Sequence, residues 1–405
     1  MREENAAPLP RGEAAAAAAA VDAAAVTALL ADLVRIDSVN PLLVPGAAGE
    51  TEIASFVALR VRAMGLDTEI HQAAPNRPNV HARLRGRGGG RTLILNAHMD
   101  TVGVDGMAIP PFDPVVRDGR MFGRGTGDTK AGLAAMIEAI TAIRRARIPL
   151  RGDVLFAAVA DEEYSSLGTE YLARTERADG CIIAEDTALN LLIAHQGFAW
   201  YEIELLGRAA HGKHPEVGID AIAQMGRVLV ELDRLDRDVL SKNVHPLAGK
   251  AVFHNGTIVG GAEPGMYPAR CALRIEIGCN PGETMAARRA EIEAILTRLA
   301  AEDSSFHARL ATHVERTAFE VDPAAAIVRD LGACVAAVTG SDPALIGDNA
   351  WMDAAITQDA GIPTVVFGPR GGGYHAEVEW VEIEQVVAAA RILAATIVRF
   401  CGVAG

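Results

Sequence analysis

Two residues able to bind a metal ion or move a proton end an apolar segment, in the stretch LILNAHMDTV over residues 93–102. His98 and Asp100 are two positions apart, and such residues in a β-strand point to the same face of the sheet. A neighbouring carboxylate commonly holds a metal-binding histidine in one tautomer. The pair could equally be a hydrogen-bonded end of a strand, so the spacing alone is a weak indication.

Further acidic and imidazole side chains follow other apolar segments. Asp128, in GRGTGDTKAG, precedes a long helical pattern, where it can cap the helix or present its oxygens to a cation. His375 lies in the glycine-rich GPRGGGYHAEVEW, where a loop histidine is more often unremarkable than a ligand. Burying several carboxylates without cations is costly, although a solvated turn would avoid that cost. Such carboxylates end VADEE and CIIAED: Asp161, Glu162, Glu163, Glu185 and Asp186.

These positions share a place in the expected fold. Continuous apolar segments alternate with helical patterns, which favours an α/β fold with a sheet covered by helices on both faces. In such sheets, binding sites gather beyond the carboxyl ends of the strands. Mixed imidazole and carboxylate ligands suit zinc, with cobalt or manganese as substitutes. Of two adjacent carboxylates, one can bind metal while the other takes a proton from water.

The order of the elements predicts an inserted domain. Segments between residues 197 and 316 follow the order β-α-β-β-α-β, which is typical of a ferredoxin-like α+β unit. The apolar runs 80–84 and 91–97 flank a glycine-rich loop and predict a hairpin. We therefore expect a flexible tail over 1–20, a catalytic domain over 21–196 and 317–405, and the inserted domain over 197–316.

Composition excludes several classes of partner. The net charge of −14 provides no basic surplus for binding nucleic acid. Five cysteines without a C-x-x-C pair argue against a disulfide framework and favour a cytoplasmic protein. The N-terminus begins with acidic residues, so a signal peptide is a poor fit, and no run of 18 strongly apolar residues predicts a membrane span.

Six segments resemble one known family in order and spacing. They are NAHMDTV, GRGTGDTKAGLAAMI, ADEEYSSLGTEYL, IIAEDT, GRAAHGKHPEVGIDAI and GPRGGGYHAEVEWV. The chain is similar over nearly everything after residue 25 to the acetylornithine deacetylase, succinyl-diaminopimelate desuccinylase, carboxypeptidase G and aminoacylase family of dinuclear zinc hydrolases. Six motifs in register are far more specific than any one of them. The resemblance implies a zinc-exopeptidase-like catalytic domain and an inserted lid domain.

The resemblance also implies a ligand set for two zinc ions. Asp128 would bridge the two ions. His98 and Glu185 would complete one metal site, and Glu163 and His375 would complete the other.

The same resemblance implies the catalytic roles. Glu162 would be the general base, and Asp100 would orient His98. His211, in RAAHGKHP, is similar to a lid-domain histidine that reaches the partner subunit's active site and helps stabilise the oxyanion. The lid domain mediates dimerisation in the family, so a homodimer is implied. A structural role for His211 at a hinge is the alternative.

This chain departs from the family pattern at two places that bear on the site. Asp186 stands where many relatives have proline, which leaves the choice between Glu185 and Asp186 as ligand open. Gly278 stands where relatives often have an arginine that binds a substrate carboxylate. Arg370 and Arg270 are the candidate replacements. Arg370 is the better candidate because it lies five residues before His375, although it could be a solvated loop residue.

The function implied is hydrolysis of the amide bond of an N-acyl amino acid by an acetylornithine deacetylase-like enzyme. A dipeptidase or a glutamate-type carboxypeptidase of the same family is the alternative. A non-catalytic binding relative is less consistent with a complete ligand set and an intact Glu162.

Overall fold

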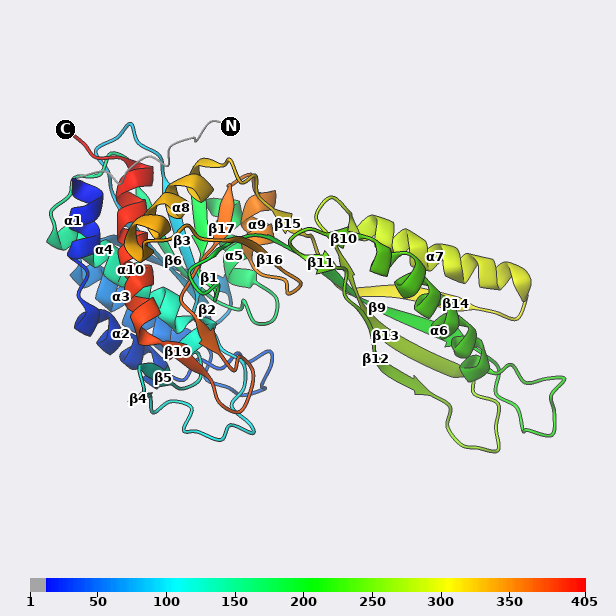
Figure 1. Ribbon diagram of the computed structural model, residues 1–405. Helices are drawn as coiled ribbons and strands as arrows, with labels where there is room; N and C mark the ends of the chain where they lie inside the picture. Colours follow the sequence, from blue (N-terminus) through cyan, green and yellow to red (C-terminus); the bar gives the residue numbers. More distant parts are fainter. Residues whose placement is uncertain (1–11) are drawn as a thin grey trace. The chain divides into compact units, whose positions relative to one another are not determined.

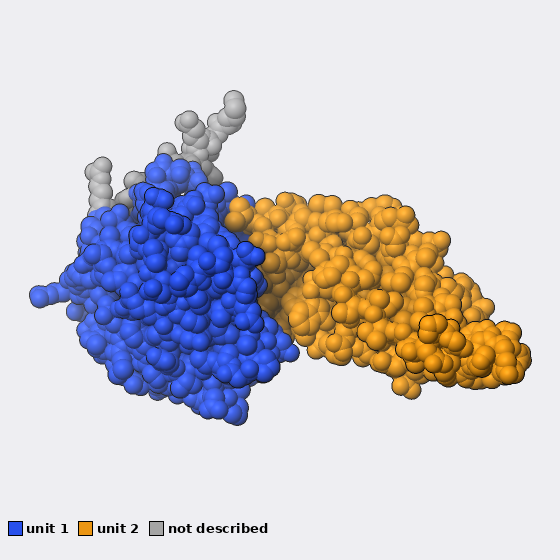
Figure 2. All heavy atoms as spheres, turned by 90° about the horizontal axis from the view of Figure 1, so that it is seen from below, with its two compact units in different colours: residues 1–193, 321–345, 356–405 blue, residues 194–320, 346–355 orange. Residues whose placement is uncertain are grey.

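The computed structural model describes residues 12–405 and divides the chain into two compact units. Unit 1 contains the chain up to Ile193, together with Val321–Leu345 and Ile356–Gly405; unit 2 contains Ala194–Glu320 and Ile346–Ala355 (Figure 2). The inserted domain was expected over 197–316, so unit 2 extends a few residues further at each end and takes up one additional segment.

A mixed sheet of nine strands has most of its residues in unit 1, and only residues 194–195, 319–320 and 346–348 of it belong to unit 2 (Figure 1). Four strands run parallel in the order β6-β3-β7-β17. Their residues are buried throughout, because helices cover both faces. The expected α/β class is therefore confirmed. The parallel strands are β3 (Leu93–His98), β6 (Val154–Val159), β7 (Gly180–Ile183) and β17 (Thr364–Val366). The outer strands are β1 (Asp67–Ala74), β2 (Arg77–Leu84), β8 (Leu191–His195), β15 (Phe319–Glu320) and β16 (Leu345–Asp348).

The expected hairpin between residues 80–84 and 91–97 is wrong. β6 lies between β2 and β3, antiparallel to the first and parallel to the second. The glycine-rich loop is fastened to the segment that precedes β6, because Arg87 and Gly88 donate backbone hydrogen bonds to the carbonyls of Leu150 and Arg151. Both apolar runs therefore pair with a strand that comes about 60 to 80 residues later in the chain.

Helices cover the sheet of unit 1. Four of them, α1, α2, α4 and α10, pack against one another in one layer (Figure 1). α3 contacts β1 and β2, α5 contacts β1, β2 and β6, and α8 contacts β7, β17 and α10. The helices are α1 (Glu13–Ala19), α2 (Ala23–Arg35), α3 (Thr51–Ala63), α4 (Ala131–Arg145), α5 (Leu167–Thr175), α8 (Ala326–Thr339), α9 (Ala354–Asp359) and α10 (Ile383–Cys401).

The first helix corrects the prediction of a flexible tail over residues 1–20. Residues 1–11 lie outside the described part of the chain. The alanine run that follows forms α1, because alanine has the highest helix propensity and Ala14 and Ala17 are buried in a layer with α10. Within residues 12–405, no single helix is long and apolar enough to cross a membrane; α1 and α2 meet that test only together, as a pair bent by 60°.

A second, small sheet in unit 1 holds two of the site loops together. Its order is β18-β19-β5-β4, and β19 pairs antiparallel with β5. The segment containing Asp128 follows β5, and His375 lies between β18 and β19. The strands are β4 (Val115–Arg117), β5 (Arg120–Phe122), β18 (Gly371–Gly372) and β19 (Trp380–Glu382).

Unit 2 contains a four-stranded antiparallel sheet in the order β12-β13-β9-β14. The chain order is strand, helix, strand, strand, helix, strand, with a short β10–β11 hairpin (Val244–His245 and Gly249–Lys250) after the first helix. This is the ferredoxin-like arrangement that the sequence predicted. The elements are β9 (Gly197–Leu206), α6 (Ala221–Asp238), β12 (Phe253–Gly260), β13 (Arg270–Cys279), α7 (Met285–Glu302) and β14 (Ala308–Arg316).

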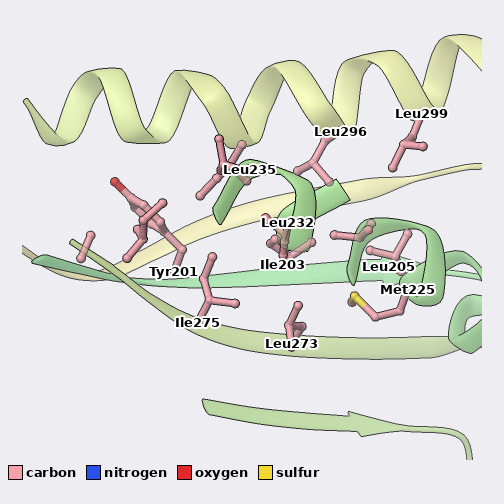
Figure 3. Close-up of a cluster of buried hydrophobic side chains, with 14 of the residues drawn as sticks. Tyr201, Ile203, Leu205, Met225, Leu232, Leu235, Leu273, Ile275, Leu296 and Leu299 are labelled. Atoms are coloured by element: carbon pink, nitrogen blue, oxygen red, sulfur yellow. The ribbon is translucent and has the colours of Figure 1, made fainter. Parts of the chain in front are cut away.

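The core of unit 2 lies between the two helices and one face of this sheet (Figure 3). Alternate residues of β9 are buried, as expected for a strand with one covered face. The buried residues of α6 recur at intervals of three and four, which places them along one side of the helix. Residues in this core include Tyr201, Ile203, Leu205, Met225, Leu232, Leu235, Leu273, Ile275, Leu296 and Leu299.

Candidate active site

Most of the predicted site residues lie at or just beyond the carboxyl ends of four adjacent parallel strands, at one edge of the sheet. β3 ends at His98, and β6 is followed by Glu162 and Glu163. β7 is followed by Glu185, and β17 leads into the loop with His375. The carboxyl ends of parallel strands lie at the same edge, so residues more than 250 positions apart in the sequence meet there.

Asp128 lies in the short turn Thr126–Lys130 rather than at the start of a helix. Its backbone is non-helical, with φ −123° and ψ 88°, and α4 begins only at Ala131. The interpretation of Asp128 as a helix cap is therefore wrong. Its carboxylate faces two histidines, with Oδ1 3.0 Å from Nε2 of His98 and Oδ2 3.3 Å from Nε2 of His375.

The predicted ligands form two groups that share Asp128. His98, Asp128 and Glu185 form one group, and Asp128, Glu163 and His375 form the other; within each group the candidate ligand atoms lie within 4.8 Å of one another. Glu185 Oε1 is 3.4 Å from His98 Nε2, and Glu163 Oε2 is 3.1 Å from His375 Nε2. Imidazole and carboxylate donors in two groups with a common carboxylate fit two divalent cations.

The electrostatics of the cluster also fit cations. Burial and, after it, the charge of Asp128 raise the pKa of Glu163 to about 7. Burial likewise raises the pKa of Glu185 to about 8, against the opposing effect of His98. Burial also raises the pKa of Asp128, but hydrogen bonds with His375 and His98 outweigh it and hold that pKa below its ordinary value. These carboxylates repel one another in a low-dielectric site, and a divalent cation would relieve that repulsion.

The structure distinguishes Glu185 from its neighbour Asp186. Glu185 contacts His98, whereas Asp186 belongs to neither group of ligands. Asp186 accepts hydrogen bonds from the backbone amides of Ala188 and Gly371 and from the hydroxyl of Tyr374. Glu185 is therefore the carboxylate of this pair that can join the cluster.

Asp100 contacts His98 differently from the expectation. His98 Nδ1 is 2.9 Å from the backbone carbonyl oxygen of Asp100, whereas the nearer carboxylate oxygen is 3.6 Å away. The carboxylate instead accepts hydrogen bonds from the backbone amides of Glu162 and Glu163, at 3.1 and 3.2 Å, and from the side chain of Asn40, at 2.8 Å. Asp100 thus holds both His98 and the turn that carries Glu162.

A buried network of ion pairs and hydrogen bonds supports the turn that carries Glu162 and Glu163, and the sequence analysis did not predict it. Arg77 donates to Glu50 through Nε at 2.9 Å and Nη2 at 2.5 Å, and to Asp161 at 2.8 Å. Asn40 bridges Asp161 and Asp100 through its side-chain amide. The turn with Glu162 and Glu163 is therefore held from both sides. Most residues of this network are isolated in the sequence and form no motif with a recognisable spacing. Only Asp161, which immediately precedes Glu162, could have been noticed from the sequence.

Glu379 was also missed, although it lies four residues after His375. It is buried, and its two carboxylate oxygens accept hydrogen bonds from the backbone amides of Gly125, Gly127 and Asp128. A buried ion pair with Arg124, at 2.7 Å, balances its charge. Glu379 thus fastens the Asp128 turn to the segment with His375. The only available signal was an acidic residue placed between two apolar residues, Val378 and Trp380.

The remaining candidates lie outside this cluster. Arg370 is exposed in the loop after β17, and its backbone amide donates to Gln385. In unit 2, Arg270 pairs with Glu204 and Glu202 on the neighbouring strand. His211 lies on an exposed loop of the same unit, and its Nδ1 accepts a hydrogen bond from the backbone amide of Lys213, so the ring proton of the neutral form is on Nε2.

Gly278, which stands where relatives often have an arginine, lies in a closely packed part of unit 2. Gly278 donates a backbone hydrogen bond to the carbonyl oxygen of Val252, at 2.7 Å. A Cβ atom at this position would lie 3.0 Å from Gln196 Oε1 and 3.0 Å from the amide nitrogen of Val252. A side chain at position 278, in β13, would therefore press on Gln196 and on the backbone of Val252, so the departure from the family pattern involves these neighbours as well as a single side chain.

The sequence of this chain is similar to those of several known proteins. Residues 94–399 match the profile described as Peptidase family M20/M25/M40. The chain belongs to this family. An N-formyl-4-amino-5-aminomethyl-2-methylpyrimidine deformylase of Bacillus subtilis (strain 168) is 29% identical over 391 residues, covering 88% of this chain and 91% of the relative. An acetylornithine deacetylase of Myxococcus xanthus is 28% identical over 390 residues, covering 93% and 98%.

A solved structure has the same fold. The crystal structure of aminopeptidase PepT from Bacillus cereus superposes with a TM-score of 0.79 and 22% identity, covering 95% of this chain and 100% of that chain. The family that the motifs indicated is therefore confirmed, as is the fold class. As a member of the M20 family, the chain is a metal-dependent hydrolase of the class that contains metallopeptidases and amidohydrolases.

Proposed function

We propose that this M20 enzyme hydrolyses the amide bond of an N-acyl amino acid, in the manner of an acetylornithine deacetylase, with two zinc ions and Glu162 as general base. One observation carries the proposal: the two oxygens of Asp128 face two different histidines, at 3.0 and 3.3 Å, and each histidine also contacts a different glutamate. A carboxylate placed in this way can serve as a bridge between two cations.

The residues of this chain divide the chemical work. When bound, the two cations would activate a water molecule and polarise the substrate carbonyl. Glu162 would take a proton from the attacking water and deliver it to the leaving amine. Its backbone is fixed by Asp100, and its carboxylate is near enough to His98 for its charge to raise the pKa of that ring. Glu162 is thus beside the ligand cluster without belonging to either group of ligands.

Two further parts of the proposal concern unit 2. We propose that His211 donates a hydrogen bond from Nε2 to the oxyanion, which agrees with the acceptor role of its Nδ1. We also propose a homodimer formed through unit 2. The exposed residues of β12, at the edge of its sheet, support this idea because an uncovered edge strand offers unpaired backbone groups.

The names of the two relatives favour a small acyl group. One is a deformylase and the other a deacetylase, and both remove a short acyl group from nitrogen. A second candidate substrate is an N-formyl amine without a carboxylate. The glycine at position 278, where relatives often have a carboxylate-binding arginine, favours it. Arg370 remains the proposed carboxylate clamp for the first candidate, because its planar guanidinium can bind both oxygens of a carboxylate.

A substrate panel separates these candidates. We expect measurable turnover of N-acetyl amino acids, including N-acetylornithine, in the presence of zinc or cobalt. The panel should also contain an N-formyl aminomethylpyrimidine, dipeptides and an acylglutamate, compared by kcat/KM. A clear preference for dipeptides or acylglutamates would replace the deacylase proposal with the peptidase alternative. If Arg370 binds the carboxylate, Arg370→Ala should raise KM for N-acetyl amino acids and leave KM for the formyl amine unchanged.

Metal removal provides the direct test of the two-cation site. Treatment with a chelator is expected to abolish activity, and zinc or cobalt should restore it at two ions per chain, measured by elemental analysis. Zinc affinity is expected to fall as the pH drops below about 8, because protons then compete first for Glu185, whose pKa is raised to about 8, and then for Glu163, whose pKa is raised to about 7. A wild-type protein that binds one ion or none at neutral pH would contradict the proposal.

A further inference from the structure

Tyr374 contacts or adjoins three of the segments that carry the predicted ligands. It immediately precedes His375 in the sequence. Its hydroxyl donates a hydrogen bond to the carboxylate of Asp186, which immediately follows Glu185. Its ring lies against Gly127, which immediately precedes Asp128. A single side chain thus connects three loops that come from different parts of the chain.

The ring fits this place because the neighbouring residues are glycines. A Cβ atom at Gly127 would lie 2.6 Å from Cε1 of Tyr374, which is closer than real Cβ contacts allow. A Cβ atom at Gly371 would lie 2.9 Å from the hydroxyl oxygen of the same tyrosine. The backbone around Tyr374 therefore packs directly on the ring, and a shift of the ring would be transmitted to the Asp128 turn.

Asp186 provides the other half of the connection. Besides the Tyr374 hydroxyl, it accepts hydrogen bonds from the amide of Gly371 at 3.1 Å and from the amide of Ala188 at 2.8 Å. These contacts join the loop after β7 to the loop after β17. Proline, which many relatives have at this position, has no side-chain acceptor and could not make them.

The two groups of ligands differ in how firmly they are otherwise held. The side chain of His98 is 1% exposed, and its second ring nitrogen is fixed by the Asp100 carbonyl. The side chain of His375 is 56% exposed, and its backbone has the unusual φ of 57°. His375 therefore depends more on its sequence neighbour Tyr374 than His98 depends on any residue of this loop.

We propose that Tyr374 and Asp186 are positioning residues that fix His375 relative to Asp128 and Glu185, and that their hydrogen bond selectively strengthens the cation site formed by Asp128, Glu163 and His375. This inference rests on the proposed two-cation function. Loss of a residue that orients a metal ligand typically lowers metal affinity about 10–100-fold. The other site, which contains His98, keeps its own supporting contacts and should change little.

The test compares metal binding rather than activity alone. Metal-free wild type, Tyr374→Phe, Asp186→Ala and Asp186→Asn are titrated with cobalt(II), followed by calorimetry and by the visible absorption of the bound ion. We expect two ions in the wild type. In Tyr374→Phe and Asp186→Ala, one ion should bind with near wild-type affinity and the second about 10–100-fold more weakly. Asp186→Asn retains an acceptor oxygen and should be closer to the wild type.

Tyr171→Phe, on α5, is the matched control and should leave both affinities unchanged. Equal affinities at both sites in Tyr374→Phe and in wild type would overturn the inference while leaving the proposed function intact. Equal weakening of both sites would overturn the selectivity that we infer. A wild type that binds fewer than two ions would instead reject the two-cation function. If Tyr374→Phe does not fold, Asp186→Ala decides the question, since it removes the acceptor and leaves the ring in place.

Discussion

Glu162→Gln is expected to bind both metal ions and to lose most of its activity. Glutamine has the size of glutamate but cannot accept and return a proton, so the loss in kcat should be roughly 10²–10⁴-fold, the contribution of a well-placed general acid–base group. The change should leave the turn intact, because the backbone amide of Glu162, rather than its side chain, makes the hydrogen bond to Asp100.

The control for this prediction is Glu170→Gln on α5, which makes the same chemical change away from the ligand cluster. Its kcat should equal that of the wild type. Both variants are measured with N-acetyl amino acids, and their metal content is determined in parallel. Near wild-type turnover by Glu162→Gln with two bound ions would remove this residue from the mechanism. A loss accompanied by fewer bound ions would show instead that Glu162 is needed to form the site.

The ligand cluster could be predicted from the sequence because the relevant signals are local. His98 ends an apolar strand, Glu163 and Glu185 follow such strands within four residues, and parallel strands bring these positions to one edge. The spacing could not decide between Glu185 and Asp186. That choice depends on Tyr374 and Gly371, nearly 190 positions further along the chain, which donate hydrogen bonds to the carboxylate of Asp186.

The supporting network could not be predicted, for a related reason. Glu50, Arg77 and Asn40 lie in three different segments, and none belongs to a repeating pattern. What identifies them is that all three are buried and share hydrogen bonds with Asp161 or Asp100. Burial of a charged residue becomes visible only when the elements have been packed, because its sequence neighbours resemble those of a surface residue.

The partners of the strands in unit 1 also could not be predicted from local sequence patterns. The runs 80–84 and 91–97 have the length, apolar character and glycine-rich connection of a hairpin, yet β6 separates them. The five-residue and seven-residue patterns identify strands but contain no information on which strand is the partner. In unit 2, by contrast, the order of elements sufficed, since few topologies accommodate β-α-β-β-α-β in one sheet.

Replacing Arg77 is expected to have the largest effect on stability. Its side chain is 6% exposed and it balances Glu50 and Asp161, both fully buried. Arg77→Met keeps the length of the side chain but leaves two buried carboxylates without their cation, which should lower the free energy of unfolding by about 3–5 kcal/mol. Chemical denaturation of the metal-free proteins, followed by circular dichroism, measures the change. Arg85→Met, on an exposed arginine near the same strand, should have little effect.

The pH dependence of this loss identifies its cause. Burial already raises the pKa of Glu50 to about 7, and the hydrogen bond from Arg77 opposes that rise. Without Arg77 the pKa should rise further, so the folded variant would hold a proton that the unfolded chain releases at neutral pH. Its deficit relative to wild type should therefore shrink as the pH falls from 8 towards 5. The double variant Glu50→Gln with Arg77→Met should recover part of the loss at pH 8, because one uncompensated charge is absent. A deficit that is the same at pH 8 and pH 5.5, and that the double variant does not reduce, would point to lost packing of the arginine side chain rather than to unbalanced charge.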